Sequence, residues 1–482
     1  MKKTLNMMLA MMAGAMAFTA CSSDDILENN AEVQIPSQLK PMTFTAVQEG
    51  QGTRAAIDGL SIKWTAGDKI SIFDGSSVND GVQMFELATG ADETSATFTG
   101  SAASASTYYA LYPYAASTNS ESRIPTQAEA ETAAGSASDQ LSMWKMMIGM
   151  MEDYVTSELS SNGISAENQA IILAYLKNQK TTILTPGVAL EGSNIKNVVI
   201  PAEQTATAGS ADPKAMIMVA KGSDKDALEF KNVCAYVKVT PQFDCYAIAL
   251  ISKGSENLAG KMTVDCSGEN PTTTVTANGT NAVYLVGTIT ANNAYYIAIR
   301  PEALASGFTI EFLTADKNTY YARSTNNALA LARSNVKNLG EFSTTSTPWT
   351  ISSPTSGNDG SGHSWKLITP TFKMAKTLAG RLAFADIPDW GSDWALLTPE
   401  EFSNVYNNGY FTITKDNSAL LLQGAGILKY VGVTEITEDV DEDFWTSTPG
   451  SSADYQMQFV MSEGSYGCKK TNKRGVIFKY IN

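Results

Sequence analysis

The stretch Lys69-Ile-Ser-Ile-Phe-Asp-Gly75 shows a pattern that recurs through the N-terminal half of the chain. A short run rich in β-branched and aromatic residues ends at Asp-Gly, a strong turn signal between strands. The same dipeptide recurs at Asp58-Gly59 and Asp80-Gly81. Strands are predicted at Met42 to Val47, Ser61 to Trp64, Lys69 to Phe73, Gln83 to Leu87 and Ser95 to Thr99. Short strands at this spacing predict a β-sandwich, here assigned to residues 42–190.

A helical hairpin is predicted inside this first sandwich, over residues 136–180. Met143, Met147, Met150 and Tyr154 recur at helical spacing, and a second apolar patch follows the turn Asn162-Gly163. The Met-rich face either packs on the sandwich or forms an adaptable binding surface.

A second sandwich is predicted over residues 191–342. Its apolar runs are Asn197 to Ile200, Ala215 to Ala220, Cys234 to Val239, Tyr246 to Ile251, Ala282 to Val286, Tyr295 to Arg300 and Phe308 to Leu313. Residues 343–364, rich in Ser, Thr and Gly, are predicted to be a linker. Tryptophan gathers beyond it, which indicates a differently built third domain over residues 365–482. Within it, Thr398 followed by Pro399 predicts the start of a capped helix.

The N-terminus has the pattern of a bacterial lipoprotein signal. Lys2 and Lys3 precede an apolar run that is too short to span a bilayer, and small residues then lead to Cys21. Residues 1–20 are therefore expected to be a signal peptide, Cys21 the lipidated residue, and residues 21–41 a tether. The acidic stretch Ser22-Ser-Asp-Asp25 resembles a surface-export signal of Gram-negative anaerobes. The expected location is the outer face of the cell outer membrane, with the N-terminal lipid as the only membrane attachment.

The composition of the chain bears on which partners it could bind and on the state of its cysteines. A formal charge of −15 argues against nucleic acid as a partner, because phosphate-backbone binding needs clustered Lys and Arg. Cys234, Cys245, Cys266 and Cys468 show no metal-binding spacing. A disulfide among the first three and buried free thiols are both open on the sequence alone.

Catalysis is not expected. The one histidine, His363, falls in the Gly- and Ser-rich linker, which is a poor place for a catalytic base. There is no phosphate-binding Gly loop and no metal-binding His pair, so neither cofactor nor metal is expected. The acidic run Glu438 to Asp443 could hold Ca²⁺, but it lacks the EF-hand spacing, which favours a solvated loop. Paired carboxylates for glycoside hydrolysis stay open, since their separation is not visible in a sequence.

The order of motifs over both sandwiches resembles the fimbrillin-like pilus subunits of Gram-negative anaerobes. In the first domain the matching pieces are Met42-Thr-Phe-Thr-Ala46, Thr53-Arg-Ala55, Trp64-Thr-Ala-Gly-Asp-Lys-Ile-Ser-Ile-Phe73, Ala96-Thr-Phe-Thr-Gly100 and Leu111-Tyr-Pro-Tyr114. In the second they are Ile200-Pro-Ala-Glu-Gln204, Met218-Val-Ala220, Phe230-Lys-Asn-Val-Cys-Ala235, Leu258-Ala-Gly260, Ala294-Tyr-Tyr-Ile-Ala-Ile-Arg-Pro301 and Asn338-Leu-Gly340. The resemblance implies two tandem transthyretin-like β-sandwiches, from which the helical insertion is a departure.

The resemblance also implies a mode of assembly. An Arg-specific protease would cut after Arg54, the strand Met42 to Val47 would be lost, and a strand from another fimbrial subunit would fill the groove by strand addition. The loop around Arg54 is rich in Gly and Gln, which suits a protease. The alternative is that Arg54 is an ordinary loop cation.

The third domain resembles a C-type-lectin-like domain of α+β fold, through Leu396-Leu-Thr398, Trp445-Thr-Ser-Thr448 and Arg474-Gly-Val-Ile-Phe478. The ligand motifs of sugar-binding C-type lectins are absent. Trp390, Trp394 and Trp445 could contact a glycan or protein ligand, or could be core residues. The whole chain is thus expected to be a fimbrial subunit, with an adhesive third domain at the pilus tip. The alternative is a monomeric surface lipoprotein that binds glycans without polymerising.

Overall fold

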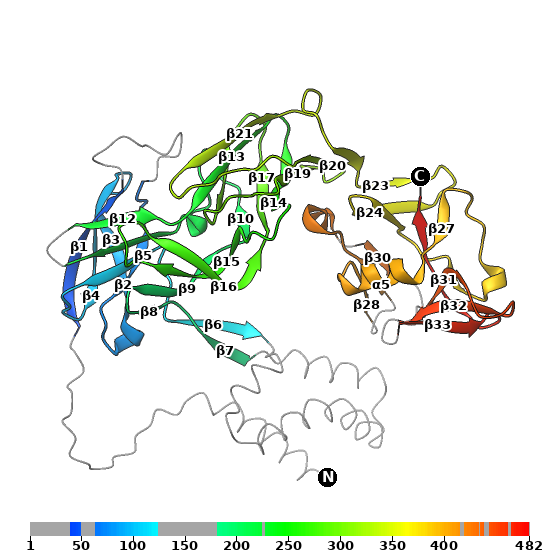
Figure 1. Ribbon diagram of the computed structural model, residues 1–482, viewed down its shortest axis with the longest axis horizontal. Coiled ribbons are helices and arrows are strands. Elements are labelled where there is room, and N and C mark those ends of the chain that lie inside the picture. The colour runs from blue at the N-terminus through cyan, green and yellow to red at the C-terminus, as the bar shows by residue number, and fades with distance from the viewer. Residues whose placement is uncertain are drawn as a thin grey trace, which may run out of the picture.

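The computed structural model describes residues 39–49, 63–123, 181–223, 227–414, 419–432, 434–437, 443–460 and 464–481. These residues are mainly β, as the turn spacing predicts, and are arranged as an arch with the first strand at one end and the C-terminal strands at the other (Figure 1). The predicted helical hairpin at residues 136–180 lies outside them. Among the described residues, no helix is long and apolar enough to cross a bilayer.

The N-terminal strands form one sheet that closes on itself, where two stacked sheets were predicted. Strand β1 closes it by pairing with β4 on one side and with β12 on the other. Two of its strands, β11 and β12, come from residues 191–342, the range predicted for the second sandwich. In order around the barrel the strands are β1 (Lys40–Gln48), β12 (Leu228–Asn232), β11 (Met218–Gly222), β5 (Tyr108–Tyr112), β2 (Lys69–Phe73), β3 (Val82–Thr89) and β4 (Ser95–Ala102).

Aromatic side chains fill the barrel. The indole of Trp64 is fully buried and stands edge-on to the rings of Phe98 and Phe230, with ring centroids 5.0 and 5.3 Å apart. Such edge contacts add to the free energy gained by burying the rings. The barrel core therefore joins residues before and after the 124–180 segment.

Three sheets form the middle unit. The largest holds β10 (Glu203–Thr205), β17 (Ala282–Ile289), β14 (Cys245–Ser252), β19 (Phe308–Thr314), β20 (Thr319–Thr325) and β22 (Ile351–Pro354). The second holds β18 (Tyr295–Ile299), β13 (Ala235–Pro241) and β21 (Val336–Phe342). The third holds β16 (Thr272–Thr280), β15 (Ala259–Asp265), β9 (Asn194–Ile200) and β8 (Ala189–Glu191). Cys234, Cys245 and Cys266 are buried free thiols here, which decides between the two alternatives left open by the sequence.

A separate two-stranded ribbon pairs β6 (Thr118–Arg123) with β7 (Thr181–Pro186). Arg123 lies opposite Thr181, so the chain leaves and re-enters the described structure at one place. Short 3-10 helices lie between strands at four places in the described ranges: η2 (Val78–Gly81), η3 (Pro213–Ala215), η4 (Phe384–Asp386) and η5 (Gly426–Val431).

The described residues of the C-terminal unit, from 356 to 481, contain three small sheets and one α-helix. The sheets are β23 (Ser356–Asn358), β24 (Ser364–Thr369), β25 (Phe372–Ala375), β35 (Phe478–Tyr480) and β27 (Trp394–Leu396); then β26 (Gly380–Leu382), β34 (Arg474–Val476), β31 (Asp443–Pro449), β32 (Tyr455–Val460) and β33 (Gly464–Lys469); then β28 (Phe411–Thr414), β29 (Ala419–Leu422) and β30 (Thr434–Thr437).

The predicted capped helix is confirmed as α5 (Pro399–Asn407). The Thr398 hydroxyl accepts a hydrogen bond from the Glu401 amide at 3.1 Å, and the Glu401 carboxylate accepts one from the Thr398 amide at 2.8 Å. This reciprocal capping box satisfies two amides that the first turn leaves without partners.

The middle and C-terminal units pack directly on each other. Residues 343–364, predicted as a flexible linker, supply β22 to the large sheet of the middle unit and β23 to the C-terminal unit. The helix η5 packs on β14 and β19, and one apolar cluster includes Leu313 of the middle unit and Leu428 of the C-terminal unit. Hydrophobic burial thus orders a stretch whose composition suggests flexibility.

Candidate functional site

Strand β1 is the first candidate site, because it is the strand whose loss was predicted to open a groove. It runs antiparallel to β4 from Lys40, opposite Ala102, to Val47, opposite Ser95, and parallel to β12 from Ala46 to Gln48. Phe44, Ala46 and Gln48 are buried while the residues between them are less so. Main-chain hydrogen bonds on two sides and alternate buried side chains therefore hold it.

The aromatic ring of Phe44 anchors β1 inside the barrel. It lies 5.3 Å from the ring of Phe85 and 5.0 Å from that of Tyr108, both in edge-on geometry. Removal of β1 would leave these rings facing an open apolar slot between β4 and β12.

A carboxylate fixes the end of β1. The side chain of Glu49, the residue after β1, accepts hydrogen bonds from Arg333 Nη1 at 2.7 and 2.8 Å and from the Asn232 amide at 2.8 Å. The Ser334 hydroxyl also donates to it. The Glu49 amide donates to the Phe230 carbonyl at 2.9 Å, which continues the pairing with β12. No sequence pattern pointed to this pair, because Glu49 and Arg333 lie far apart along the chain.

Two of the predicted site residues, Cys21 and Arg54, lie outside the described residues. The chain is described up to Glu49 and again from Lys63, so Arg54 belongs to the segment that directly follows β1 and its carboxylate.

Trp390 and Trp394 lie together in the C-terminal unit, with ring centroids 5.1 Å apart. His363 stacks on Trp390 at 4.1 Å, and its Nδ1 lies 2.7 Å from Asp359 Oδ2. The same carboxylate oxygen accepts a hydrogen bond from the Trp394 indole at 2.8 Å. His363 was predicted to lie in a flexible tether; it belongs instead to this packed cluster.

Hydrogen bonds set the ionisation of Asp359. Burial raises its pKa, but bonds from His363, Trp394 and two backbone amides outweigh burial and hold the pKa well below its usual range. Asp359 is therefore ionised, and its hydrogen bonds fix the side chains of His363 and Trp394.

Trp445 lies elsewhere in the C-terminal unit and is fully buried. Its indole donates to the Leu382 carbonyl at 2.8 Å and packs edge-on against Phe384. Trp394 is also a core residue at 6% exposure, whereas Trp390 is partly exposed. Of the three tryptophans proposed for ligand contact, only Trp390 reaches the surface.

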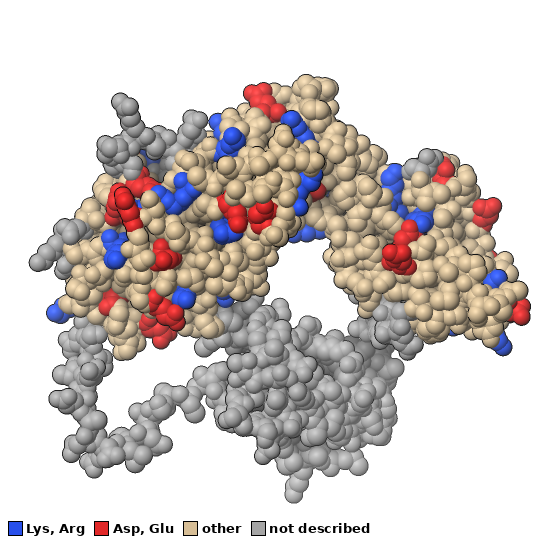
Figure 2. Space-filling view, viewed as in Figure 1, with Lys and Arg blue, Asp and Glu red and all other residues tan. Residues whose placement is uncertain are grey.

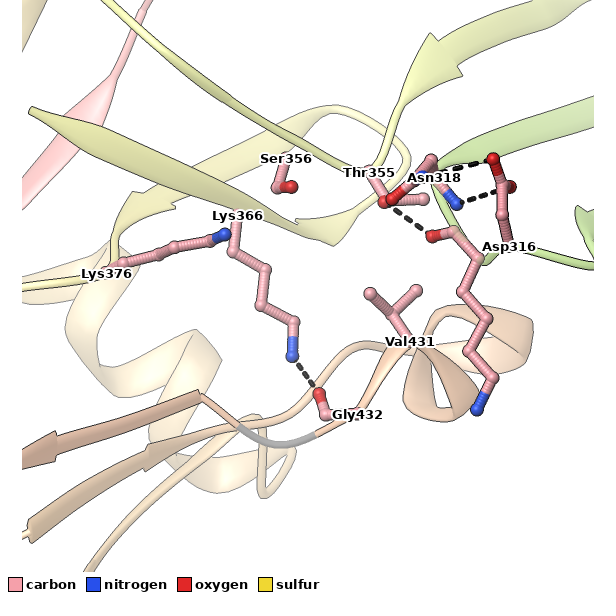
Figure 3. Close-up of a pocket in the computed structure, with 9 residues that line it drawn as sticks. Asp316, Asn318, Thr355, Ser356, Lys366, Lys376, Val431 and Gly432 are labelled. Atoms are coloured by element: carbon pink, nitrogen blue, oxygen red, sulfur yellow. Dashed lines mark hydrogen bonds between the residues drawn. The ribbon is translucent and has the colours of Figure 1, made fainter.

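A cavity of about 230 Å³ opens at the joint between the middle and C-terminal units. Figure 3 shows the lining side chains, with Lys366 pointing to the Gly432 carbonyl and the Asp316 to Asn318 turn on the opposite wall. Lys366 also donates to the Leu422 carbonyl at 3.2 Å. Burial, and then the nearby charge of Lys376, lower the pKa of Lys366 to about 8.

The acidic run predicted as a solvated loop is described only at its last residue. Asp443 forms an ion pair with Arg474, with Oδ2 2.8 Å from Nε. No group of three or more potential metal ligands occurs within the described ranges. Charged side chains are scattered over the face seen in Figure 2, without a continuous basic stripe.

Comparison with known proteins finds matches of low sequence identity among solved structures. No protein-family model matches the chain, and no curated protein matches it. A "putative cell adhesion protein" of Bacteroides uniformis is 13% identical, with a TM-score of 0.33, over 65% of this chain and 96% of that chain. One of Bacteroides ovatus is 10% identical, with a TM-score of 0.31, over 66% and 96%. A fimbrial protein of Bacteroides ovatus is 13% identical, with a TM-score of 0.17, over 87% and 95%.

Proposed function

We propose that the protein is a surface-exposed fimbrial subunit, assembled by proteolytic loss of β1 and insertion of a strand from a partner subunit. The observation that carries the proposal is the place of β1: it bridges β4 and β12 in the closed barrel, and it leads directly into the segment that contains Arg54. In this proposal the lipid on Cys21 delivers the chain to the outer membrane, and no enzymatic activity is involved.

The barrel without β1 has the features of a strand acceptor. The edges of β4 and β12 would present main-chain groups that a new strand can satisfy, since an exposed edge is a template for pairing. The positions of Phe44 and Ala46 would become apolar pockets that set the register of the incoming strand.

The C-terminal unit suits a terminal, adhesive position. Strand β35 lies between β25 and β27, with Tyr480 opposite both Lys373 and Trp394. A strand held on both edges is not available for donation to another subunit. The unit also lies at the end of the arch away from β1, so it would project beyond the assembly site (Figure 1).

Limited digestion of the full chain with an Arg-specific protease tests the proposal. We expect one early cut after Arg54, found by N-terminal sequencing at Ala55, and none in the Arg54→Ala variant. The Arg323→Gln variant, which alters an exposed arginine of β20, should be cut as the wild type is. The cut protein should then take up a labelled peptide with the sequence of β1.

The opposite result would point to the alternative function. A chain that stays intact at Arg54, or a cut chain that binds no strand peptide, would contradict assembly by strand replacement. It would favour a monomeric surface lipoprotein, for which binding of the full chain to a glycan and protein array is the direct measurement.

A further inference from the structure

We infer that Arg333, Ser334 and the Asn232 amide form a carboxylate-binding site at one end of the slot occupied by β1, and that this site selects a replacement strand with a carboxylate at the position of Glu49. The inference rests on the proposed function and adds to it the chemistry of the partner strand. In the intact chain the Glu49 side chain fills the site.

The donors of the site are held by residues that do not belong to β1. Arg333 Nη1 donates to the Asn232 carbonyl at 2.7 Å, and its Nη2 donates to the Asn270 side chain at 2.7 Å. The arginine is thus fixed from β12 and from the loop before β16. If residues up to Arg54 leave, the donors remain in place and only the carboxylate is missing.

The backbone at Ser334 also indicates a built site. Its φ is 60°, in the left-handed region that is unfavourable for a residue other than glycine. The Ser334 amide donates to the Cys234 carbonyl at 2.9 Å, and its hydroxyl faces Glu49. Strain of this kind persists where surrounding contacts hold it, often at binding sites.

Leaving the carboxylate-binding site empty would be unfavourable, so the site would favour incoming strands that carry a carboxylate. The side chains of Arg333 and Glu49 are 21% and 22% exposed, so solvent only partly replaces a lost partner. A guanidinium and an amide left without an acceptor in such a place lose charge-assisted hydrogen bonds, which are stronger than neutral ones. An incoming strand that restores a carboxylate would therefore bind more tightly than one that does not.

The site also fixes direction and register. Gln48 pairs with Phe230 in the parallel ladder, and Glu49 follows at the C-terminal end of the strand. The apolar positions of Phe44 and Ala46 lie a fixed distance before it. A strand inserted in the opposite direction would bring its carboxylate to the wrong end of the slot. We therefore expect partner strands with two alternate apolar residues followed, three residues after the second, by a carboxylate.

Peptide exchange on the full chain after cleavage at Arg54 tests the inference. The probes are two amidated, fluorescent peptides that extend from Lys40 to Gln51: a native peptide, which keeps Glu49, and a Glu49→Gln peptide. We expect the Glu49→Gln peptide to bind at least about tenfold more weakly, from the loss of a charge-assisted hydrogen bond. A third peptide, which stops at Gln48 with a free terminus, shows whether a main-chain carboxylate can replace the side chain.

Variants of the protein show whether Arg333 causes the preference. The Arg333→Gln protein should bind the native and the Glu49→Gln peptides alike, and Arg333→Glu should reverse the preference toward a Glu49→Lys peptide. The matched control, Arg323→Gln, should keep the wild-type preference. Equal affinity of the wild-type protein for the native and the Glu49→Gln peptides would overturn the carboxylate site and leave strand replacement standing.

Failure of all peptides to bind would count against the proposed function, so the site is also tested in the intact chain. We expect amide hydrogen exchange in β1 to be about tenfold or more faster in Glu49→Gln and in Arg333→Gln, and no faster in the double variant than in either one. Independent, additive effects of the two substitutions would overturn the inference.

Discussion

Phe44 stands edge-on to Tyr108 across the interior of the barrel, with ring centroids 5.0 Å apart. One residue belongs to the strand predicted to be lost and the other to the part that stays. The Tyr108 hydroxyl donates to the Ala103 carbonyl at 3.0 Å, which fixes that ring from behind. The Tyr108 ring is therefore held in position by the rest of the barrel and would stay there to contact a replacement strand.

The Phe44→Ala substitution should lower the free energy of unfolding of the barrel by about 3–5 kcal/mol, because it leaves a cavity among fixed aromatic rings. Native-state amide hydrogen exchange of the barrel strands, as a function of urea concentration, measures this. The Thr45→Ala variant, one residue on and exposed, should change it by less than about 0.5 kcal/mol. Similar losses for both would show that side-chain burial does not anchor β1.

Loss of the Asp359 charge should weaken the cluster of His363, Trp390 and Trp394. The pKa of Asp359 is held below its usual range in the folded state, so its contribution to stability is present above the unfolded pKa of about 3.9 and is lost as the pH falls below it. The Asp359→Asn variant should lack this acid-dependent step. Tryptophan fluorescence measured between about pH 5 and pH 2, a range that brackets the unfolded pKa, detects this acid-dependent step.

The control for this experiment is Asp386→Asn, which alters an exposed carboxylate of the same unit. Its acid response should match that of the wild type. An unchanged acid response in Asp359→Asn would mean that other carboxylates control the transition.

Lys366 should make stability rise with pH in the alkaline range. Burial lowers its pKa from 10.5 to about 8, so between these values the unfolded chain binds more protons than the folded one. The free energy of unfolding then increases with pH across that window. Thermal unfolding from about pH 7.5 to 10.5 should show this rise in the wild type and not in Lys366→Met.

Lys337→Met, which alters an exposed lysine of β21, should behave as the wild type does in the same scan. A rise of equal size in Lys366→Met would exclude Lys366 as its source.

Tyr430 of η5 should couple the unfolding of the middle and C-terminal units. Its ring lies 6.2 Å from that of Tyr246 and 6.0 Å from that of Tyr284, and its hydroxyl donates to Glu203. We expect calorimetry to resolve two transitions of these units in Tyr430→Ala and a single joint transition in the wild type, because the substitution removes a contact across the joint. The exposed Tyr466→Ala serves as control, and a single transition in both variants would contradict the coupling.

The β-rich fold and the start of α5 could be predicted from the sequence, because both depend on local signals. Asp-Gly turns separate short strands whose apolar residues alternate. Thr398 and Glu401 satisfy amides at the start of their own helix. The barrel could not be predicted, since its closure depends on pairing of β1 with β12, which lies far along the chain. Sequence periodicity reports the faces of a strand and not its neighbours.

The order of the linker could not be predicted for a related reason. The Gly- and Ser-rich stretch around His363 lacks apolar periodicity, yet it is ordered by contacts with Trp390 and Trp394 that come later in the chain. The Glu49 site escaped prediction entirely, because a single acidic residue beside Arg333 is recognisable only in three dimensions. Cys21 and Arg54 keep the status of predictions.

Strand β22 and helix η5 have a mechanical consequence. One adds to the sheet of the middle unit and the other packs on its outer face, so two points of attachment join the C-terminal unit to the middle unit. A pull on the C-terminal unit would load both points together, and the unit could not swing on a single hinge. Force and torque applied to the C-terminal unit would therefore be transmitted through the middle unit to the barrel and to the strand between β4 and β12.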